Sequence, residues 1–272
     1  MVRSLWTAAS GMKAQQTSVD TIANNLANVN TTGYKSQTTQ FKTLLYQTMQ
    51  EASTTANGDT KPTTAQVGLG ARVASINSIY TQGAELASDN KMAMYINGRG
   101  FFSVTGEDGG TYYTRNGDFD WALDDNGTRV LTNSEGNKVL DTQGNPITLP
   151  ATAATDSVSV GTDGQVAYKR PDGTYVLTGQ SIGLYQFANP VGLEKRGDNL
   201  LEANNVSGPA MNEATVAGLT PSKINQGFLE GSNVNVADEM VNLIIAQRAY
   251  EMNSKAITTS DSMLDTANNL KR

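Results

Sequence analysis

The sequence predicts an α+β protein in which a discontinuous α-helical coiled-coil domain, built from both ends of the chain, encloses a mainly β domain inserted between them. Two patterns carry this prediction. Apolar residues recur every seven positions near each terminus, and the middle of the chain alternates apolar and polar residues between frequent turns. With 272 residues, 38% of them hydrophobic, the chain is long enough for one large domain or two smaller ones.

The N-terminal heptad pattern has two series. The first is Leu5, Met12, Val19 and Leu26, and the second, three residues later, is Ala8, Gln15, Ile22 and Val29. A seam of about 25 residues corresponds to roughly 37 Å of helix. We expect the helix to end at Asn30–Gly33, where the residue types tolerate a left-handed cap.

The C-terminal pattern is apolar on one line only. Its first series is Leu243, Tyr250, Ile257 and Leu264, and its second, Met240, Gln247, Ser254 and Asp261, decays into polar residues. Asn235 is a plausible N-cap, with Asp238 three residues later. The pattern predicts a helix over about 235–270.

The middle of the chain reads as strands and turns. Alternation is seen in Phe119, Trp121 and Leu123, and again in Met92, Met94 and Ile96. Asp163-Gly164 and Asp172-Gly173 are turn signals. A weak repeat, LDDNGTRVL, LTNSEGNKVL and LDTQGNPITL, places a glycine four or five residues after a leucine in each copy and predicts a β-meander.

These patterns predict four segments. Residues 1–46 and 226–272 form the two halves of the helical domain, and 67–225 form the β-rich domain. Between them, 47–66 is polar and contains Gly58 and Pro62, so it is either a flexible linker or an ordered extended spacer.

Composition excludes several classes of function. The chain has no cysteine and no histidine, which removes the commonest general base, thiol nucleophiles and most metal sites. Its formal net charge of -6 leaves no basic surface for nucleic acid, and no apolar stretch is long enough to span a membrane. The first residues do not form a signal-peptide core, so we expect any export to need no cleaved signal.

Two features hint at chemistry, and each has a plainer reading. Asp118 and Asp120 would share one face of a strand, which is usually its solvated side rather than a catalytic pair. The run from Asp124 to Gly127 lacks the twelve-residue loop of an EF-hand and reads as a turn. We predict no enzyme activity, cofactor or metal.

The heptads allow two arrangements. The two ends could pair as an antiparallel hairpin within one molecule, or each helix could have several neighbours. Residues 5–29 carry only Lys13 and Asp20 as charges, and Gly11 lowers helix propensity, which favours several close neighbours. Asn24, Asn25 and Asn28 could satisfy polar groups between packed helices or lie on a solvated face.

Four segments resemble a known family. ANNLANVNTTGYK from Ala23, NGRGFFSV from Asn97, YTRNGDF from Tyr113 and GFLEGSNVNVADEMVNLIIAQRAYEMNSKAITTSDSML from Gly227 are similar to signatures of the bacterial flagellar basal-body rod protein family. The stretch LLYQTMQ from Leu44 and QVGLGARV from Gln66 look most like the distal rod members; proximal rod and short hook subunits are the nearest alternatives.

The resemblance implies a structural subunit that polymerises helically through both ends into a hollow drive shaft, which transmits torque from motor to hook. It implies other rod proteins, the hook protein and ring or bushing proteins as partners, and an extracytoplasmic place in the basal body reached by type III export. We predict an assembly interface formed by Leu5, Met12, Val19, Ile22, Asn25, Leu26, Asn28, Val29, Met240, Leu243, Gln247, Tyr250, Ile257 and Leu264.

Two rivals come from other classes. In the first, the chain is a monomeric module whose β domain binds cell wall or glycan and whose helices form a stalk. In the second, it is a polysaccharide hydrolase with two carboxylates in a cleft. Dependence of assembly on protein concentration distinguishes the first rival from a rod subunit, and assays on peptidoglycan test the second.

Overall fold

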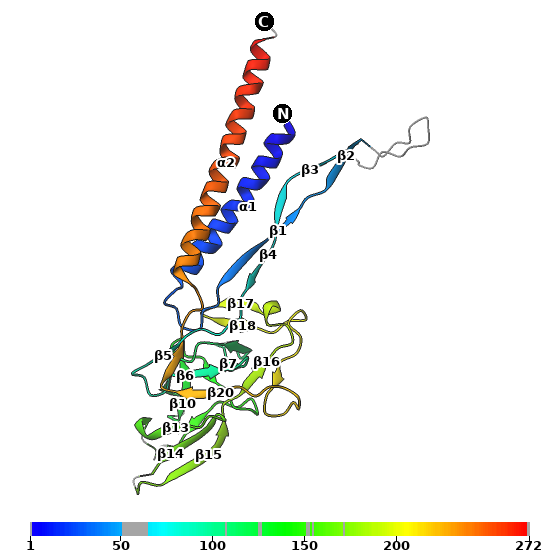
Figure 1. Ribbon diagram of the computed structural model, residues 1–272. Coiled ribbons are helices and arrows are strands. Elements are labelled where there is room, and N and C mark those ends of the chain that lie inside the picture. The colour runs from blue at the N-terminus through cyan, green and yellow to red at the C-terminus, as the bar shows by residue number, and fades with distance from the viewer. Residues whose placement is uncertain are drawn as a thin grey trace. The chain divides into compact units, whose positions relative to one another are not determined.

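The structure is a computed structural model that describes residues 2–50, 65–106, 108–124, 127–150, 153, 155–170 and 172–270. The chain has a helix at each end and a mainly β middle (Figure 1), as the sequence predicts at that level of detail. It divides into two compact units. Unit 1 comprises Met1–Ala27, Gln37–Ser78 and Val234–Arg272, and unit 2 comprises Asn28–Ser36 and Ile79–Asn233.

Unit 1 contains both helices, α1 (Val2–Ala27) and α2 (Val236–Asn269). The predicted N-cap is confirmed, because the Asn235 side chain accepts a hydrogen bond from the backbone N–H of Ala237. Asp238 and Glu239 occupy the first turn of α2, where negative charge complements the helix dipole. The basic residues Lys271 and Arg272, which the sequence places after α2 and whose charge would suit the C-terminal end of a helix dipole, lie outside the described residues.

Helix α1 ends earlier than the heptad series. Asn28 and Val29 lie in the turn that follows Ala27, where the Thr31 N–H donates to the Asn28 carbonyl at 3.2 Å and the Thr31 hydroxyl donates to Asn28 Oδ1 at 3.0 Å. A side chain that hydrogen-bonds its own turn competes with the next helical turn. The left-handed residue is Gly33, with φ of 71°.

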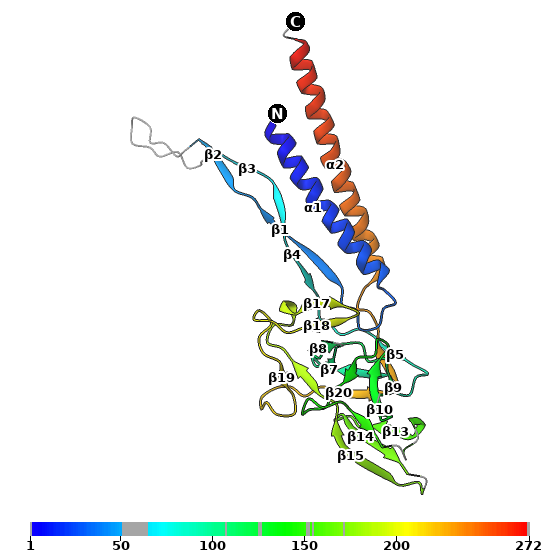
Figure 2. The same cartoon turned by 180° about the vertical axis from the view of Figure 1, so that it is seen from behind.

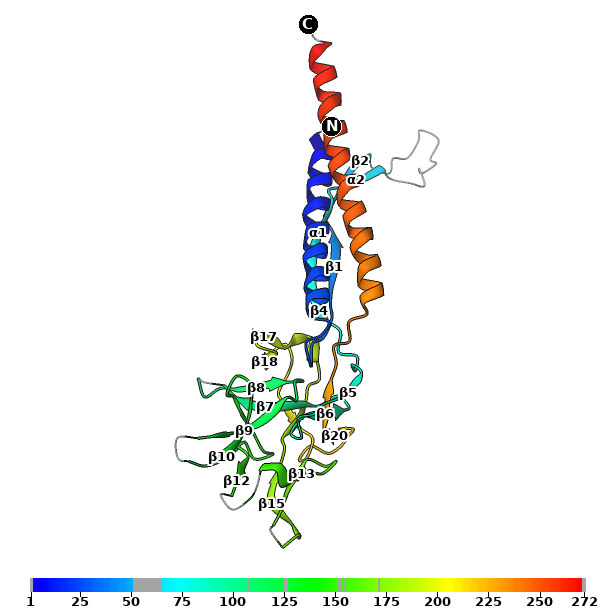
Figure 3. The ribbon, with the colours of Figure 1, turned by 90° about the vertical axis from the view of Figure 1, so that its left-hand side faces the viewer.

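The two helices pack antiparallel within one chain, so the first of the two predicted arrangements is present. The Ser4 and Ser260 hydroxyls are 3.2 Å apart, a Cβ added at Gly11 would lie 2.9 Å from Asn253 Nδ2, and Asn25 Nδ2 donates to Glu239 Oε1 at 3.2 Å. Residue numbers rise along α1 as they fall along α2 (Figures 1 and 3).

Unit 1 also contains a long two-stranded antiparallel ribbon. Strand β1 (Gln37–Thr43) pairs with β4 (Ala71–Ser78), and β2 (Tyr46–Gln50) pairs with β3 (Ala65–Gly68). Backbone bonds from Leu44 N–H to Gly70 O and from Leu69 N–H to Leu45 O join the two pairs into one ribbon. Helix α1 contacts both α2 and the β1–β4 part of this ribbon (Figure 3).

The ribbon contains both ends of the linker predicted at 47–66. Residues 47–50 and 65–66 of that segment are paired strands, and 51–64 lie outside the described residues. The boundaries of the four predicted segments therefore stay predictions.

Unit 2 is built of short antiparallel strands (Figures 1 and 2). They are β5 (Glu85–Ala87), β6 (Met94–Asn97), β7 (Phe101–Thr105), β8 (Thr111–Thr114), β9 (Phe119–Leu123), β10 (Arg129–Asn133), β11 (Lys138–Val139), β12 (Thr148–Leu149), β13 (Val158–Val160), β14 (Gln165–Lys169), β15 (Tyr175–Ser181), β16 (Leu184–Gln186), β17 (Glu194–Gly197), β18 (Leu200–Glu202), β19 (Met211–Asn212), β20 (Lys223–Gln226) and β21 (Phe228–Glu230). Two 3-10 helices, Thr155–Ser157 and Pro190–Gly192, interrupt them.

The strands form one ten-stranded sheet and smaller sheets. The order in the large sheet is β12-β10-β11-β7-β8-β18-β17, with β9 paired to β10, and β16 paired to β7 and β19. Strands β13, β14 and β15 form a separate three-stranded sheet. The two strands nearest to α2 in the sequence pair early strands, β20 with β6 and β21 with β5, so the end of unit 2 closes on its beginning.

The main core of unit 2 lies between these sheets. Phe102, Phe119 and Val139 are completely buried in it. The predicted alternation holds at the start of β9, where Phe119 is buried and Asp120 is exposed. It fails for Met92–Ile96, where all five side chains are buried, because this segment is covered on both faces.

The repeated glycines occupy equivalent turns. Gly127, Gly136 and Gly144 all have positive φ, and each donates its N–H to the carbonyl of the residue three positions earlier. Those acceptors are Asp124, Asn133 and Asp141. The turn therefore needs an Asp or Asn at its first position and a glycine at its fourth, which explains the weak repeat.

Candidate assembly site

An uncovered apolar surface lies on the first half of α2. Val241, Ile244 and Ile245 are 56%, 54% and 61% exposed, and Met240 is also exposed. On the side of α2 that faces α1, Ala246 is buried and Leu243 is half-buried. Residues 240–247 carry no charge and include only two polar side chains, Asn242 and Gln247, a pattern typical of a helix with several packed neighbours.

The structure divides the predicted interface residues by exposure. Ile22 and Asn25 are buried inside their own chain, and Met240, Gln247 and Tyr250 are exposed. The remaining predicted residues are half-buried: Leu5, Met12, Val19, Leu26, Asn28, Val29, Leu243, Ile257 and Leu264. Asn28 and Val29 belong to unit 2.

The line of α2 that faces α1 differs by one residue from the predicted second series. It contains Ala246, Asn253 and Ser260, whereas Gln247 and Asp261 one residue later are exposed. Small residues on both helices, such as Ala8 and Ala14 on α1, allow this close packing.

Asn25 shows how the buried amide is satisfied. Its Oδ1 accepts from the Gln37 N–H at 2.8 Å and its Nδ2 donates to the Gln37 carbonyl at 2.8 Å, so the side chain pairs with the first residue of β1 as a neighbouring strand would. Nδ2 also donates to Glu239. A neutral amide meets these groups without the cost of burying a charge.

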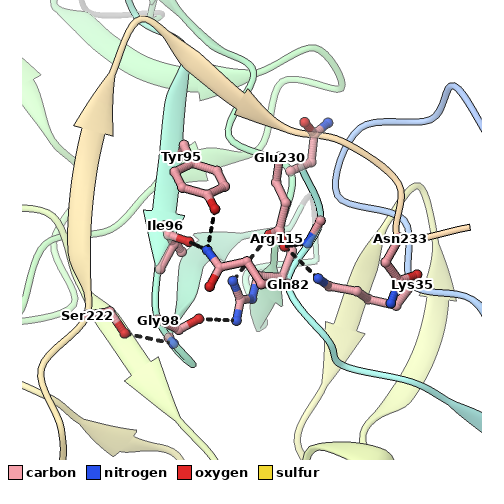
Figure 4. A network of polar contacts seen from close by, with 12 residues as sticks. Lys35, Gln82, Tyr95, Ile96, Gly98, Arg115, Ser222, Glu230 and Asn233 are labelled. Atoms are coloured by element: carbon pink, nitrogen blue, oxygen red, sulfur yellow. Dashed lines mark hydrogen bonds and ion pairs between the residues drawn. The ribbon is translucent and has the colours of Figure 1, made fainter. Parts of the chain in front are cut away.

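Unit 2 contains a buried ionic cluster around Glu230, shown in Figure 4. Its carboxylate accepts from Lys35 Nζ at 2.6 Å, from Arg115 Nη1 at 3.2 Å and from the Gly83 N–H at 3.0 Å. The exposed fractions of the Lys35, Arg115 and Glu230 side chains are only 6%, 4% and 1%. Lys35 also donates to the Thr81 carbonyl and Arg115 to the Gly98 carbonyl, both at 2.7 Å.

Burial dominates the electrostatics of this cluster. It lowers the pKa of Lys35 and of Arg115, although the nearby Glu230 carboxylate acts in the opposite direction on both. With two cations and one anion, the cluster depends on the Glu230 carboxylate to keep either cation buried.

Asn233 connects three chain segments of unit 2 through neutral hydrogen bonds. Its Oδ1 accepts from the Ser36 N–H and its Nδ2 donates to the Ile79 carbonyl, each at 2.7 Å. The Ile79 N–H in turn donates to the Ser36 carbonyl at 2.8 Å, and the Gly33 N–H donates to the Glu230 carbonyl. The segment after α1, the segment after β4 and the segment before α2 are thus held together within unit 2.

Gly33 has a steric reason to be glycine. A Cβ at this position would lie 2.6 Å from the backbone nitrogen of Asn116, besides the strain of its positive φ. The Thr32 hydroxyl and Asn116 Oδ1 are hydrogen-bonded at 2.9 Å beside it.

Sequence reasoning missed the ionic cluster, although the signature segments contain it. Lys35 lies in ANNLANVNTTGYK, Arg115 in YTRNGDF, and Glu230 in the C-terminal segment. Lys35 is the only charged residue of its segment, whereas Arg115 and Glu230 share theirs with other charges, so the sequence offered a signal at Lys35 alone. The exposed residues Val241, Ile244 and Ile245 were also missed, and the uncharged stretch that contains them could have identified them.

The acidic residues weighed for chemistry have structural partners. Asp118 accepts from Asn90 Nδ2 at 3.0 Å, and Asp124 pairs with Lys138 at 2.6 Å. Among the described residues, no group of three or more acidic, histidine or cysteine side chains could hold a metal ion. No helix in that part of the chain is long and apolar enough to cross a membrane.

Three family models match the chain. They are described as "Flagella basal body rod protein" at residues 5–35, "Flagellar hook protein FlgE/F/G D1 domain" at 95–168 and "Flagellar basal body rod FlgEFG protein C-terminal" at 225–270. The first match contains Lys35, the second Arg115 and the third Glu230.

Curated relatives match over the full length. The sequence is 43% identical over 277 residues to the flagellar basal-body rod protein FlgG of Borreliella burgdorferi and 39% identical over 272 residues to that of Bacillus subtilis. It is 30% identical over 278 residues to the flagellar hook-basal body complex protein FlhP of Bacillus subtilis. Each alignment covers 100% of both chains.

Proposed function

This chain belongs to the flagellar basal-body rod protein family and is a structural subunit of the flagellar rod, and we propose that it forms the distal rod by helical polymerisation through its two ends. Family membership places it in the basal body as a component that interacts with other rod and hook proteins, and its relatives are named as rod proteins rather than enzymes. The distal position is supported by full-length identities of 39–43% to rod proteins named FlgG, against 30% to FlhP.

The observation that carries the polymerisation proposal is the exposed apolar surface at Val241, Ile244 and Ile245. Full burial of an exposed Val or Ile contributes about 1.5 to 3 kcal/mol, and these side chains still have more than half of their surface to bury, so each would contribute about 1 to 2 kcal/mol. An identical chain is the partner that a rod subunit meets at every position of the shaft. In a helical polymer the patch contacts a different surface of the next copy, so the interface does not close.

In this proposal the half-buried seam residues, such as Leu5, Leu243 and Ile257, belong to a coiled coil that acquires further helices from neighbouring copies. The ribbon would also pack against neighbouring copies. Two strands alone are marginally stable in water, and Leu45, Tyr46 and Met49 are exposed on them. Residues 47–66 then act as a spacer that packs against adjacent subunits and keeps the shaft straight, with hook and ring proteins contacting the finished tube.

The proposal places the subunit outside the cytoplasm, in a hollow shaft that transmits torque. It is tested with Ile245→Asp, which adds a charge at a position that is exposed in the single chain. The variant should unfold at the same temperature as the wild type as a monomer, yet fail to extend purified rod seeds in a pelleting assay. Leu123→Asp, at an exposed apolar position of unit 2, is the matched control and should assemble. Normal pelleting of Ile245→Asp would refute the proposed interface.

A further inference from the structure

Charges are unequally distributed within unit 1. Helix α1 and the described strands of the ribbon carry Arg3, Lys13, Lys42 and Arg72 against the single acid Asp20. Helix α2 carries Asp238, Glu239, Glu251, Asp261 and Asp265 against Arg248 and Lys255. Within the described part of unit 1 the only ion pair joins Arg248 and Glu251, both on α2, so the two sets of opposite charge do not neutralise each other.

On the ribbon, two cations lie directly opposite each other. Lys42 on β1 is the register partner of Arg72 on β4, and both side chains are exposed. Side chains of directly opposed residues lie on the same face about 5 Å apart, where like charges are destabilising. Neither cation forms an ion pair with any described residue.

On α2, two acidic residues likewise lie close together without a nearby opposite charge among the described residues. Asp261 and Asp265 are four residues apart on one helical face and are both exposed. Like charges at this spacing repel, and the described last turn of α2 has no basic residue to offset them. Neither Asp forms an ion pair within the described residues.

We propose that the basic pair Lys42/Arg72 of one copy binds the acidic pair Asp261/Asp265 at the end of α2 in a second copy. Each pair is unfavourable in the isolated chain and is neutralised by the other, so contact removes two repulsions and forms opposite-charge contacts. The occupant is a second copy because the chain itself supplies both complementary pairs, each exposed and without an ion-pair partner among the described residues.

This inference rests on the proposed polymerisation and adds its orientation. Basic ribbon against acidic helix end is a contact between different surfaces, so the same contact repeats from copy to copy without closing. It also predicts that assembly weakens with salt, because exposed charge pairs are screened at about 8 Å in 0.15 M salt.

The experiment is a charge swap in the full chain, read as the concentration needed to extend purified rod seeds at low salt. K42E/R72E should raise that concentration about tenfold, corresponding to roughly 1.4 kcal/mol per contact. D261K/D265K should do the same. The fourfold variant K42E/R72E/D261K/D265K exchanges the two surfaces and should assemble within about threefold of the wild type.

The matched control is K91E/R99E, which makes the same charge change at two exposed cations of unit 2 and should assemble as the wild type does. Circular dichroism of the monomers checks that each variant is folded. Assembly of K42E/R72E at the concentration of this control, or no recovery in the fourfold variant, would overturn the inference while leaving polymerisation intact. Failure of the wild type to extend seeds would instead overturn the proposed function.

Discussion

Removing one negative charge from the buried cluster of unit 2 should destabilise that unit strongly. Glu230→Gln keeps the size of the side chain and one acceptor, but leaves Lys35 and Arg115 buried without a counter-charge. Loss of one partner from a buried ion pair costs about 3 to 5 kcal/mol, and burial already opposes the charge on both cations. That is a large part of the 5 to 15 kcal/mol that typically stabilises a domain.

Tryptophan fluorescence can report on unit 2 alone. The chain has two tryptophans, Trp6 on α1 and Trp121 on β9 against the main core of unit 2. In a Trp6→Phe background, which alters an exposed side chain, urea unfolding followed at Trp121 measures the free energy of unfolding of unit 2.

The size of the effect distinguishes a buried cluster from an ordinary ion pair. Glu202→Gln breaks the exposed pair with Arg196 and should cost less than about 1 kcal/mol. Adding Lys35→Met to Glu230→Gln removes one of the two stranded cations and should recover part of the loss. If Glu230→Gln costs no more than Glu202→Gln, the cluster does not stabilise unit 2 and the reasoning is refuted.

Two further predictions concern unit 2. Gly33→Ala should destabilise unit 2 by more than Gly144→Ala does, because both glycines have positive φ but only at Gly33 would a Cβ collide with the Asn116 backbone. Gly144→Ala should cost about 1 kcal/mol. Equal losses of unfolding free energy in urea would contradict the steric argument. Burial raises the pKa of the Tyr113 hydroxyl from 10.0 to about 12, so between these values the folded state keeps a proton that the unfolded state loses. The contribution of this group to stability is therefore complete below pH 10 and should decline as the pH rises towards about 12. Tyr113→Phe keeps the ring packed against Phe187 and should show a shallower decline, whereas identical pH profiles would refute the assignment.

Local patterns in the sequence predicted local structure well. Both helices, the Asn235 cap and the glycine turns depend on residues within about one turn of each other, and each is present. The exact face of α2 was harder, because the line that meets α1 is made of Ala246, Asn253 and Ser260. Small and polar residues carry little periodic signal, so the heptads selected the neighbouring line.

Long-range pairing could not be read from the sequence. Glu230 meets residues 195 and 115 positions away in the chain, and nothing local to Lys35 or Arg115 identifies that partner. The same limit applies to Asn25, whose amide was expected between helices but also completes the edge of a strand. The resemblance identified the segments that contain Lys35, Arg115 and Glu230. Only the structure shows that these three side chains meet in one buried ionic cluster.

The cluster also fixes the register of β21, the strand that precedes α2 in the chain. In β21 the side chains alternate between faces, so a shift of one residue would move the Glu230 carboxylate away from Lys35 and Arg115. The cost would resemble that of Glu230→Gln, because both cations would lose their partner. Asn233 follows three residues later and bonds Ser36 and Ile79 in the same register, and the Asn235 cap follows two residues after that. The buried Glu230 carboxylate therefore fixes the register of β21, and the Asn235 cap, five residues later, sets the starting residue of the helix that carries the proposed assembly surface.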